Sequence, residues 1–443
     1  MSNDPSPAPA PTAADARRVA VGAFVGTALE WYDFFLYGTA ASLVFNRLYF
    51  TTGDPVVATL AAFASFAVGF VARPLGGIIF GHLGDRIGRR TCLLITVVMI
   101  GVVTGLIGLL PDATDIGIAA PVLLTLLRLL QGVAVGGEWG GAITLAVEHA
   151  PPERRGRYAA MPQIGSPVGT LLSSGAFLLV ALLPPDDFDA WGWRLPFLAA
   201  FPLLAVALWL RRRVEESPLF DRLLAEDARA SAPVREVVTR AWPGLLVGAG
   251  SAFLGVGGFY LATTFVISYA TGDLGLPRPL VLGATLVAAA VEIGVLVLGG
   301  RLAERFGAAR VTVAGGVASA LVALPMFWLL DTRNAVAVVL GVTLGVAMLS
   351  IPYAVSGDLL ARLFPARLRY SGIALSANLA GIASGFVPLV ATAVLAAAGG
   401  ASWAPGLLLV AIALVTVVSG LVAPRLYAPD TELSAEGVVR PRS

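Results

Sequence analysis

The stretch GAFVGTALEWYDFFLYG, residues 22–38, is an apolar run with two carboxylates in its middle. On a helix, Glu30, Asp33 and Tyr37 stand at positions i, i+3 and i+7, so they share one face. Each charge at the centre of a bilayer costs about 2.5–3.5 kcal/mol on insertion scales. Two such groups on one membrane face need a partner, a cavity or a proton. The stretch therefore predicts the working helix of a proton-coupled membrane carrier.

The composition places the whole chain in the membrane. Of its 443 residues, 57% are hydrophobic and 13% are charged, and the mean hydropathy is +0.83. Because one spanning helix takes about 20 residues, twelve spans would use roughly 240–280 residues. Twelve apolar runs supply them, centred near residues 33, 68, 100, 132, 170, 201, 256, 289, 319, 347, 383 and 413.

The basic residues are all arginine, and their placement predicts the orientation. Without a lysine there is no phosphate-binding loop, which argues against an ATP-driven pump. In the twelve-span topology 24 of the 30 arginines fall on one side, and Arg73 and Arg128 fall within spans. By the positive-inside rule both termini are cytoplasmic in a multi-pass protein of the bacterial cytoplasmic membrane.

Few residues are available for metal or disulfide chemistry. Cys92 is the only cysteine, which excludes an intrachain disulfide, and His82 and His149 are the only histidines. We expect no metal site and no cofactor.

The chain is expected to divide into five parts. They are a disordered cytoplasmic tail (1–18), a six-helix bundle (19–211), an amphipathic cytoplasmic linker (212–241), a second six-helix bundle (242–426) and a cytoplasmic tail (427–443).

A short pattern that occurs twice indicates an internal duplication. The link that follows the second span contains Gly81, Asp85, Arg86 and Gly88. A similar set occurs 219 residues later, at Gly300, Glu304, Arg305 and Gly307. A constant offset across two sets of six spans is typical of repeated transporter halves. The predicted fold is an all-α membrane protein with twelve transmembrane helices in two pseudo-symmetric six-helix bundles around a central cavity.

Several polar residues within the spans are candidates for proton or substrate work. Arg128 needs a counter-charge or a polar cavity, and its two-pronged donor would also suit a substrate carboxylate. Each candidate has a structural alternative, namely a hydrogen bond between helices or simple packing. The substrate candidates are Tyr37, Arg128, Glu138, Trp139, Gln163, Glu292, Tyr353 and Asn378, and the proton candidates are Asp33, Glu30 and Arg128.

Three phrases carry a resemblance to a known family. LEWYDFFLYG (29–38), ARPLGGIIFGHLGDRIGRR (72–90) and RLLQGVAVGGEWGGA (128–142) resemble the metabolite:H⁺ symporters of the major facilitator superfamily, in particular shikimate-type and dicarboxylate permeases. The resemblance implies that Arg128, in the pattern RxxQG, takes part in proton coupling. It also implies a cytoplasmic gate of ion pairs, for which topology signal and solvated charge are the alternative: Asp85, Arg86, Arg89, Arg90, Glu148, Arg154, Glu304 and Arg305.

The expected function is import of a small organic acid, such as shikimate or a dicarboxylate, together with protons. An uncoupled facilitator or exchanger is one alternative, and a membrane sensor that binds without transporting is another. Catalysis is disfavoured because no nucleophile–base or metal arrangement is recognisable. The expected partners are the substrate, protons and the lipid bilayer, without nucleic acid, for a protein that works as a monomer.

Overall fold

The computed structural model describes residues 28, 30–87, 89–136, 162–205 and 233–427, and every regular element in these ranges is helical. Seven helices there are long and apolar enough to cross a membrane, and three shorter apolar helices accompany them. Large apolar side chains cover the outside, where Ile78 is 71% and Leu321 72% exposed. Such an exterior suits lipid rather than water, because lipid tails impose no penalty on exposed leucine or isoleucine.

The first half begins with a helix over residues 30–40. Its further elements are η1 (Ala41–Phe45), α2 (Asn46–Leu48), α3 (Pro55–Ile87), α4 (Arg89–Leu109), α5 (Ala113–Ile116), α6 (Ala119–Val135), η3 (Pro162–Ile164), α9 (Gly165–Val180), α10 (Pro185–Asp187), η4 (Phe188–Gly192) and α11 (Arg194–Leu198).

The second half begins after residue 232. Its elements are α14 (Pro233–Arg240), α15 (Trp242–Phe253), η5 (Leu254–Gly258), η6 (Leu261–Phe265), α16 (Val266–Ser268), η7 (Tyr269–Asp273), α17 (Arg278–Phe306), α18 (Ala308–Asp331), α19 (Ala335–Leu363), α20 (Ala366–Gly385), α21 (Val387–Ala397), α22 (Trp403–Val422) and η8 (Ala423–Arg425).

The helices begin and end at residues suited to those positions. The Asp54 side chain accepts the backbone N–H of Val56 at 2.8 Å, and proline occupies the first position of α3. Asn334 caps α19 in the same way, by accepting two backbone N–H groups. Gly307 ends α17 with φ +84°, a conformation that favours glycine.

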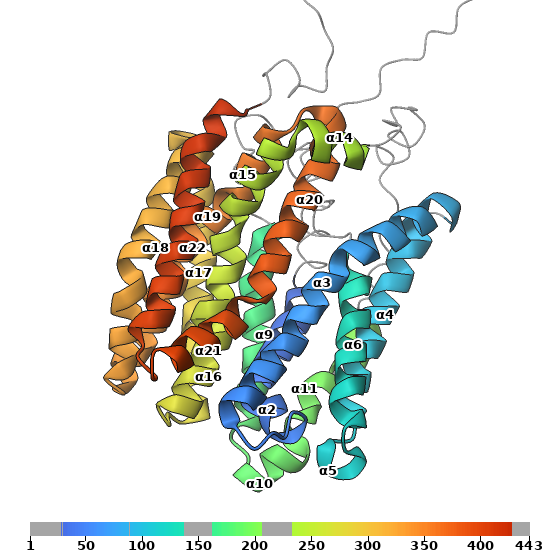
Figure 1. Ribbon diagram of the computed structural model, residues 1–443, viewed down its shortest axis with the longest axis vertical. Helices are drawn as coiled ribbons and strands as arrows, with labels where there is room; N and C mark the ends of the chain where they lie inside the picture. Colours follow the sequence, from blue (N-terminus) through green and yellow to red (C-terminus); the bar gives the residue numbers. More distant parts are fainter. Residues whose placement is uncertain (1–27, 29, 88, 137–161, 206–232, 428–443) are drawn as a thin grey trace, which may run out of the picture.

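The helices form two bundles that lean against each other (Figure 1). We call the end that carries α14 the upper end and the end that carries α5 and α10 the lower end. Between the halves, α3 packs on α20 and α21, and α9 packs on α17. Within the halves, α3 packs on α6 and α17 packs on α19. The two halves therefore repeat the same packing scheme, as expected for an internal duplication.

Backbone contact without intervening side chains holds α3 against α6. A β-carbon on Gly76 would lie 1.9 Å from the Val133 carbonyl oxygen, and one on Gly132 would lie 2.0 Å from the Gly69 carbonyl oxygen. Small residues at such crossings allow membrane helices to approach closely. The close approach of α3 and α6 places Arg73 of α3 and Gln131 of α6 beside the first helix, where they contact Glu30 and Asp33.

Candidate functional site

Asp33 lies in the middle of a hydrogen-bonded cluster inside the first half. Its Oδ1 accepts a hydrogen bond from the Gln131 amide at 2.7 Å and another from the Thr104 hydroxyl. The carboxylate is 2% exposed, and its Oδ2 is buried with no hydrogen-bond partner among the described residues. The first helix, α4 and α6 thus supply one side chain each to a site with one open acceptor.

Arg128 reaches the same cluster from α6. Its Nη1 donates to the Gln131 side-chain Oε1 at 3.2 Å, so the Gln131 side chain connects the guanidinium to Asp33. No ion pair joins Arg128 directly to Asp33, although both are described. The Arg128 Nη2 is fully buried and has no hydrogen-bond partner in the described part of the chain. The network therefore holds one spare donor and one spare acceptor.

Aromatic rings enclose the Arg128 guanidinium. Its central carbon lies 4.4 Å from the Tyr37 ring centre, 4.5 Å from that of Phe34 and 5.1 Å from that of Phe66. Ring faces attract a cation, so they compensate part of its lost hydration. A β-carbon on Gly69 would lie 2.5 Å from the Arg128 Nε. The space for the guanidinium exists because residue 69 has no side chain.

A second charged pair lies beside this cluster. Arg73, on α3, forms an ion pair with Glu30 one turn before Asp33. The Arg73 guanidinium lies 4.6 Å from the centre of the Phe34 ring, and the Arg128 guanidinium lies 4.5 Å from the same centre. The first half thus collects two carboxylates and two guanidinium groups around one aromatic residue.

The two halves meet over an aromatic cluster centred on Tyr260. Its ring lies 5.1 Å from that of Phe66 and 5.4 Å from that of Phe70, both on α3. It also contacts Trp31 and Phe35 of the first helix. Nearer the lower end, the Ser42 hydroxyl donates to the Thr264 carbonyl at 2.7 Å. These contacts join the first helix and η1 of the first half to Tyr260 and η6 of the second half.

The second half has two buried carboxylates in its described part: Asp358, which pairs with Arg362, and Glu292, which has no ion pair there. Glu292 lies on α17, is 0% exposed, and neither of its carboxylate oxygens has a hydrogen-bond partner among the described residues. Ser350 lies nearby on α19, but its hydroxyl hydrogen is donated to the Val346 carbonyl at 2.6 Å. Tyr353 lies one turn after Ser350 on the same helix.

Gln163 connects the first half to the same region. Its Nε2 donates to the Ser356 hydroxyl at 3.0 Å and to the Tyr353 carbonyl at 3.5 Å. Its Oε1 is buried and has no hydrogen-bond partner in the described ranges. Gln163, Tyr353 and Glu292, which the sequence analysis selected separately, therefore gather where α9 meets α17 and α19.

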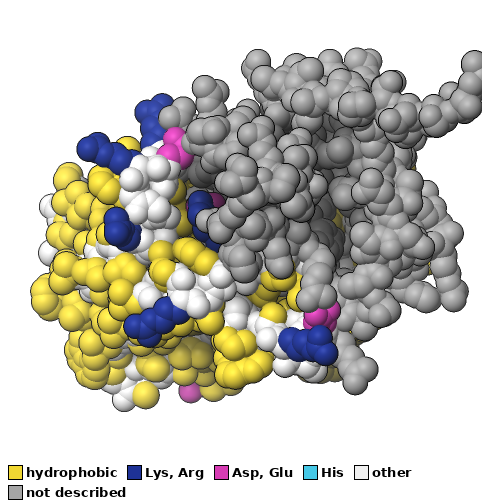
Figure 2. Space-filling model, turned by 90° about the horizontal axis from the view of Figure 1, so that it is seen from above, with side chains coloured by type: hydrophobic (Ala, Val, Ile, Leu, Met, Phe, Trp, Pro, Cys, Tyr) yellow, Lys and Arg dark blue, Asp and Glu magenta, His cyan; other side chains and the backbone are white. Residues whose placement is uncertain are grey.

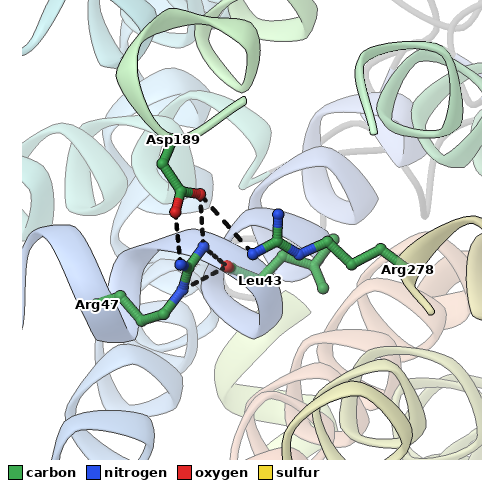
Figure 3. A network of polar contacts seen from close by, with 4 residues as sticks. All are labelled: Leu43, Arg47, Asp189 and Arg278. Atoms are coloured by element: carbon green, nitrogen blue, oxygen red, sulfur yellow. Dashed lines mark hydrogen bonds and ion pairs between the residues drawn. The ribbon is translucent and has the colours of Figure 1, made fainter. Parts of the chain in front are cut away.

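An ionic latch joins the halves at the lower end (Figure 3). Arg47 binds both Asp189 oxygens at 2.7 Å, and it also donates to the Leu43 carbonyl. Arg278, from the second half, lies 3.8 Å from the Asp189 Oδ1, which Arg47 also contacts, and 4.5 Å from the Phe188 ring centre. Asp189 thus holds an arginine from each half, and we call these three residues the Asp189 latch.

Three further predicted site residues are described and lie elsewhere in the second half. The Asn378 side chain donates to the Ala374 carbonyl of its own helix at 3.0 Å. Glu304 and Arg305 lie in the last turn of α17 at the upper end. The other predicted gate residues and two substrate candidates lie outside the part whose side chains the structure describes: Asp85, Arg86, Arg89, Arg90, Glu138, Trp139, Glu148 and Arg154.

Sequence reasoning missed three residues that complete these sites. Arg73 was recognised as an intramembrane arginine but not as the partner of Glu30. Thr104 and Asp189 carry no signal in a sequence of this composition, because a threonine within a span and an aspartate in a short link are both common. Among the described residues, no group of three or more His, Cys, Asp or Glu side chains is arranged to hold a metal ion.

Comparison with known proteins identifies the family. The model of the Major Facilitator Superfamily matches residues 23–356, so the chain belongs to this superfamily of membrane transporters and is not an enzyme. Its twelve-helix fold and its place as a multi-pass protein of the bacterial inner membrane follow from this membership together with the spanning helices.

Named relatives and solved structures agree with that assignment. The shikimate transporter of Escherichia coli (strain K12) is 40% identical over 86% of this chain and 88% of that protein. The glycine betaine/proline/ectoine/pipecolic acid transporter of Dickeya dadantii (strain 3937) is 35% identical over 91% and 82%. The crystal structure of a D-xylose-proton symporter is similar with a TM-score of 0.71, over 94% of this chain and 98% of that one. At 19% sequence identity, this last likeness concerns the fold alone.

Proposed function

We propose that this transporter imports a small organic acid, or a related polar metabolite, together with protons by alternating access. The observation that carries the proposal is the Asp33 cluster. The Asp33 carboxylate has one buried oxygen without a hydrogen bond among the described residues. The Gln131 side chain connects this carboxylate to the Arg128 guanidinium, which has one nitrogen without a hydrogen bond there. Neutralising Asp33 with a proton changes the charge balance of a site that joins three helices, and such a change couples protonation to helix movement.

Arg128 serves the proton in this proposal rather than the substrate. All of its described neighbours belong to the first half, and aromatic rings surround its guanidinium. A substrate carboxylate between the halves would meet Arg73 first, since the Arg73 Nη1 would lie 3.7 Å from a β-carbon on Gly381 in α20. Arg73, already paired with Glu30, is the guanidinium of the first half that reaches the second.

The orientation follows from the arginine distribution. Figure 2 views the upper end, and arginine side chains lie at several places on its described face. By the positive-inside rule this end faces the cytoplasm together with both termini. In this orientation the Asp189 latch lies at the external end, where it joins the two halves. Inward movement of one positive charge supplies about 2.3 kcal/mol per 100 mV, which drives uptake without ATP.

Uncoupled facilitation or exchange is the second candidate. The observation in its favour is that Asp33 is already hydrogen-bonded to Thr104 and Gln131, as a purely structural carboxylate would be. A sensor that binds without transport has no comparable support, because the two-fold packing scheme of the halves provides what alternating access requires.

The deciding experiment measures uptake into proteoliposomes with and without an inward proton gradient. Radiolabelled shikimate, 2-oxoglutarate and glycine betaine are tested on the wild type, on Asp33→Asn and on Asp115→Asn. Asp115 is an exposed carboxylate of α5 that serves as the matched control. We expect gradient-driven accumulation that Asp33→Asn abolishes, while exchange survives and Asp115→Asn is unaffected. Uptake that ignores the gradient in the wild type would establish the facilitator instead.

A further inference from the structure

The second half contains a buried carboxylate that no described residue neutralises. Glu292 makes no ion pair with a described residue, and both its oxygens lack hydrogen bonds there. Leaving a buried charge unpaired costs several kcal/mol, so natural proteins rarely retain such a group without a use. The first half answers each of its two carboxylates with polar partners. Glu292 therefore has no charged partner among the described residues and is available to a ligand.

The open atoms around Glu292 are mostly hydrogen-bond acceptors. The two carboxylate oxygens accept only, and so does the Gln163 Oε1. The Gln163 amide cannot turn its nitrogen toward the open side, since the Tyr353 carbonyl that it contacts can only accept. The Tyr353 hydroxyl is the one open donor described in this region, so the three acceptors outnumber it and suit a ligand that brings donors.

Tyr353 places these acceptors at the junction of the halves. It lies one turn after Ser350, the α19 residue beside Glu292, and its backbone carbonyl accepts a hydrogen bond from Gln163 of the first half. A β-carbon on Gly255 of η5 would lie 2.5 Å from the Tyr353 ring. The Tyr353 hydroxyl is buried without a hydrogen-bond partner of normal geometry, with Ser166 of α9 near it. The region therefore has walls from both halves, as a site used in alternating access needs.

We propose that Glu292, Gln163 and Tyr353 form a subsite for the donor-bearing part of the transported metabolite. The ligand chemistry is a group with at least two hydrogen-bond donors, which is either a pair of neighbouring hydroxyls or a protonated amine. A second carboxylate is disfavoured here by charge, and a quaternary ammonium is attracted by charge but leaves the acceptors without hydrogen bonds because it has no N–H to donate. The inference rests on the proposed transport function and narrows its substrate class to hydroxy acids and amino acids.

The test is equilibrium binding to the purified full-length protein in lipid nanodiscs, without a proton gradient, by isothermal titration calorimetry. The four probes are shikimate, which offers hydroxyls, L-proline, which offers N–H donors, and 2-oxoglutarate and glycine betaine, which offer neither. We expect shikimate or L-proline to bind at least about ten-fold more tightly than both donorless probes, as hydrogen bonds to a charged group imply. Which of the two binds identifies the source of the donors.

Variants then locate the donor-binding group. Glu292→Gln keeps the shape and removes the charge, and we expect it to weaken the donor-bearing probe at least about ten-fold. Tyr353→Phe, which removes only a hydroxyl, should weaken it less. Gly294→Ala is the matched control on the same helix, because nothing lies within 4 Å of the added carbon.

Three outcomes would overturn the subsite. They are equal or tighter binding of a donorless probe, unchanged affinity in both Glu292→Gln and Tyr353→Phe, and no binding of either donor-bearing probe. Unchanged affinity together with altered proton uptake in Glu292→Gln would mean that this carboxylate holds a proton instead. Because binding is measured without a gradient, it is independent of coupling: a wild type that binds shikimate but ignores the gradient refutes symport and leaves the subsite intact.

Discussion

The two halves share one packing scheme but differ in how they hold one buried carboxylate. In the first half Asp33, Glu30, Arg73 and Arg128 are linked by hydrogen bonds, an ion pair and a shared aromatic ring. In the second half Asp358 pairs with Arg362 of its own helix, but Glu292 makes no ion pair among the described residues. The difference indicates a division of labour after duplication, in which one half keeps a self-contained charged network and the other presents an open group to the substrate.

Removing the cation from the first-half network should have the largest effect. Arg128→Met leaves Asp33 and Gln131 without their charged neighbour, and breaking a buried ionic arrangement costs about 3–5 kcal/mol. We expect a loss of unfolding free energy of that size in detergent titrations, together with loss of proton-driven uptake. Arg240→Met, on a side chain that is 80% exposed, is the control. Wild-type stability of Arg128→Met would contradict the self-contained network.

Glycine substitutions compare the packing of the two halves directly. Gly69→Ala in α3 places a carbon 2.5 Å from the Arg128 Nε, whereas Gly283→Ala in α17 meets nothing within 4 Å. We expect Gly69→Ala to lower the unfolding free energy by about 1–3 kcal/mol through overpacking. Gly283→Ala should leave it unchanged or raise it slightly. Equal effects of the two would mean that α6 moves away from α3 at no cost.

Tyrosine hydroxyls sharpen the contrast between a satisfied half and an open one. The Tyr37 hydroxyl shares a hydrogen bond with Ser65 at 2.9 Å, while the buried Tyr260 hydroxyl has no partner among the described residues. Tyr37→Phe should cost about 0.5–1.5 kcal/mol of unfolding free energy, whereas Tyr260→Phe should cost nothing. Thermal unfolding of the two variants in the same detergent measures the difference. A larger loss for Tyr260→Phe would show that its hydroxyl is already satisfied.

The Asp189 latch, which joins the halves, should give the smallest effect. Arg278→Gln removes an arginine 3.8 Å from Asp189, and partly exposed ion pairs contribute about 0.2–1 kcal/mol. The probe is Ser42→Cys in a Cys92→Ser background. We expect its thiol to react with a membrane-impermeant maleimide about two- to five-fold faster when Arg278→Gln is added than without it. Arg333→Gln, at the same end and without a described ion pair, is the control. An unchanged labelling rate in Arg278→Gln would exclude the latch as a closing element.

The sequence predicted the parts of the site that are costly in a membrane. Glu30, Asp33, Arg128 and Glu292 are conspicuous because charges in apolar runs are expensive, whatever surrounds them. Their partners were harder to predict from the sequence, since Thr104 and Gly69 are common residue types in membrane spans and their roles depend on which helices pack together. The shared face of Glu30 and Asp33 was predicted, but their division between Arg73 and Gln131 depends on the crossing of α3 and α6. The repeated loop pattern indicated the two-bundle fold, which the family match confirmed.

The order of the charged residues along the chain has a consequence for biosynthesis. The Glu30 and Asp33 carboxylates are synthesised first, and their partners Arg73, Thr104 and Gln131 follow within the next three spans. Each ionised side chain costs about 2.5–3.5 kcal/mol when its helix enters the bilayer alone. The first helix gains part of its compensation with α3 and the rest only when α4 and α6 arrive, so the early spans must assemble as a group at the insertion machinery. Glu292 receives no such compensation from the described chain, and α17 has to enter the membrane on its hydrophobicity alone.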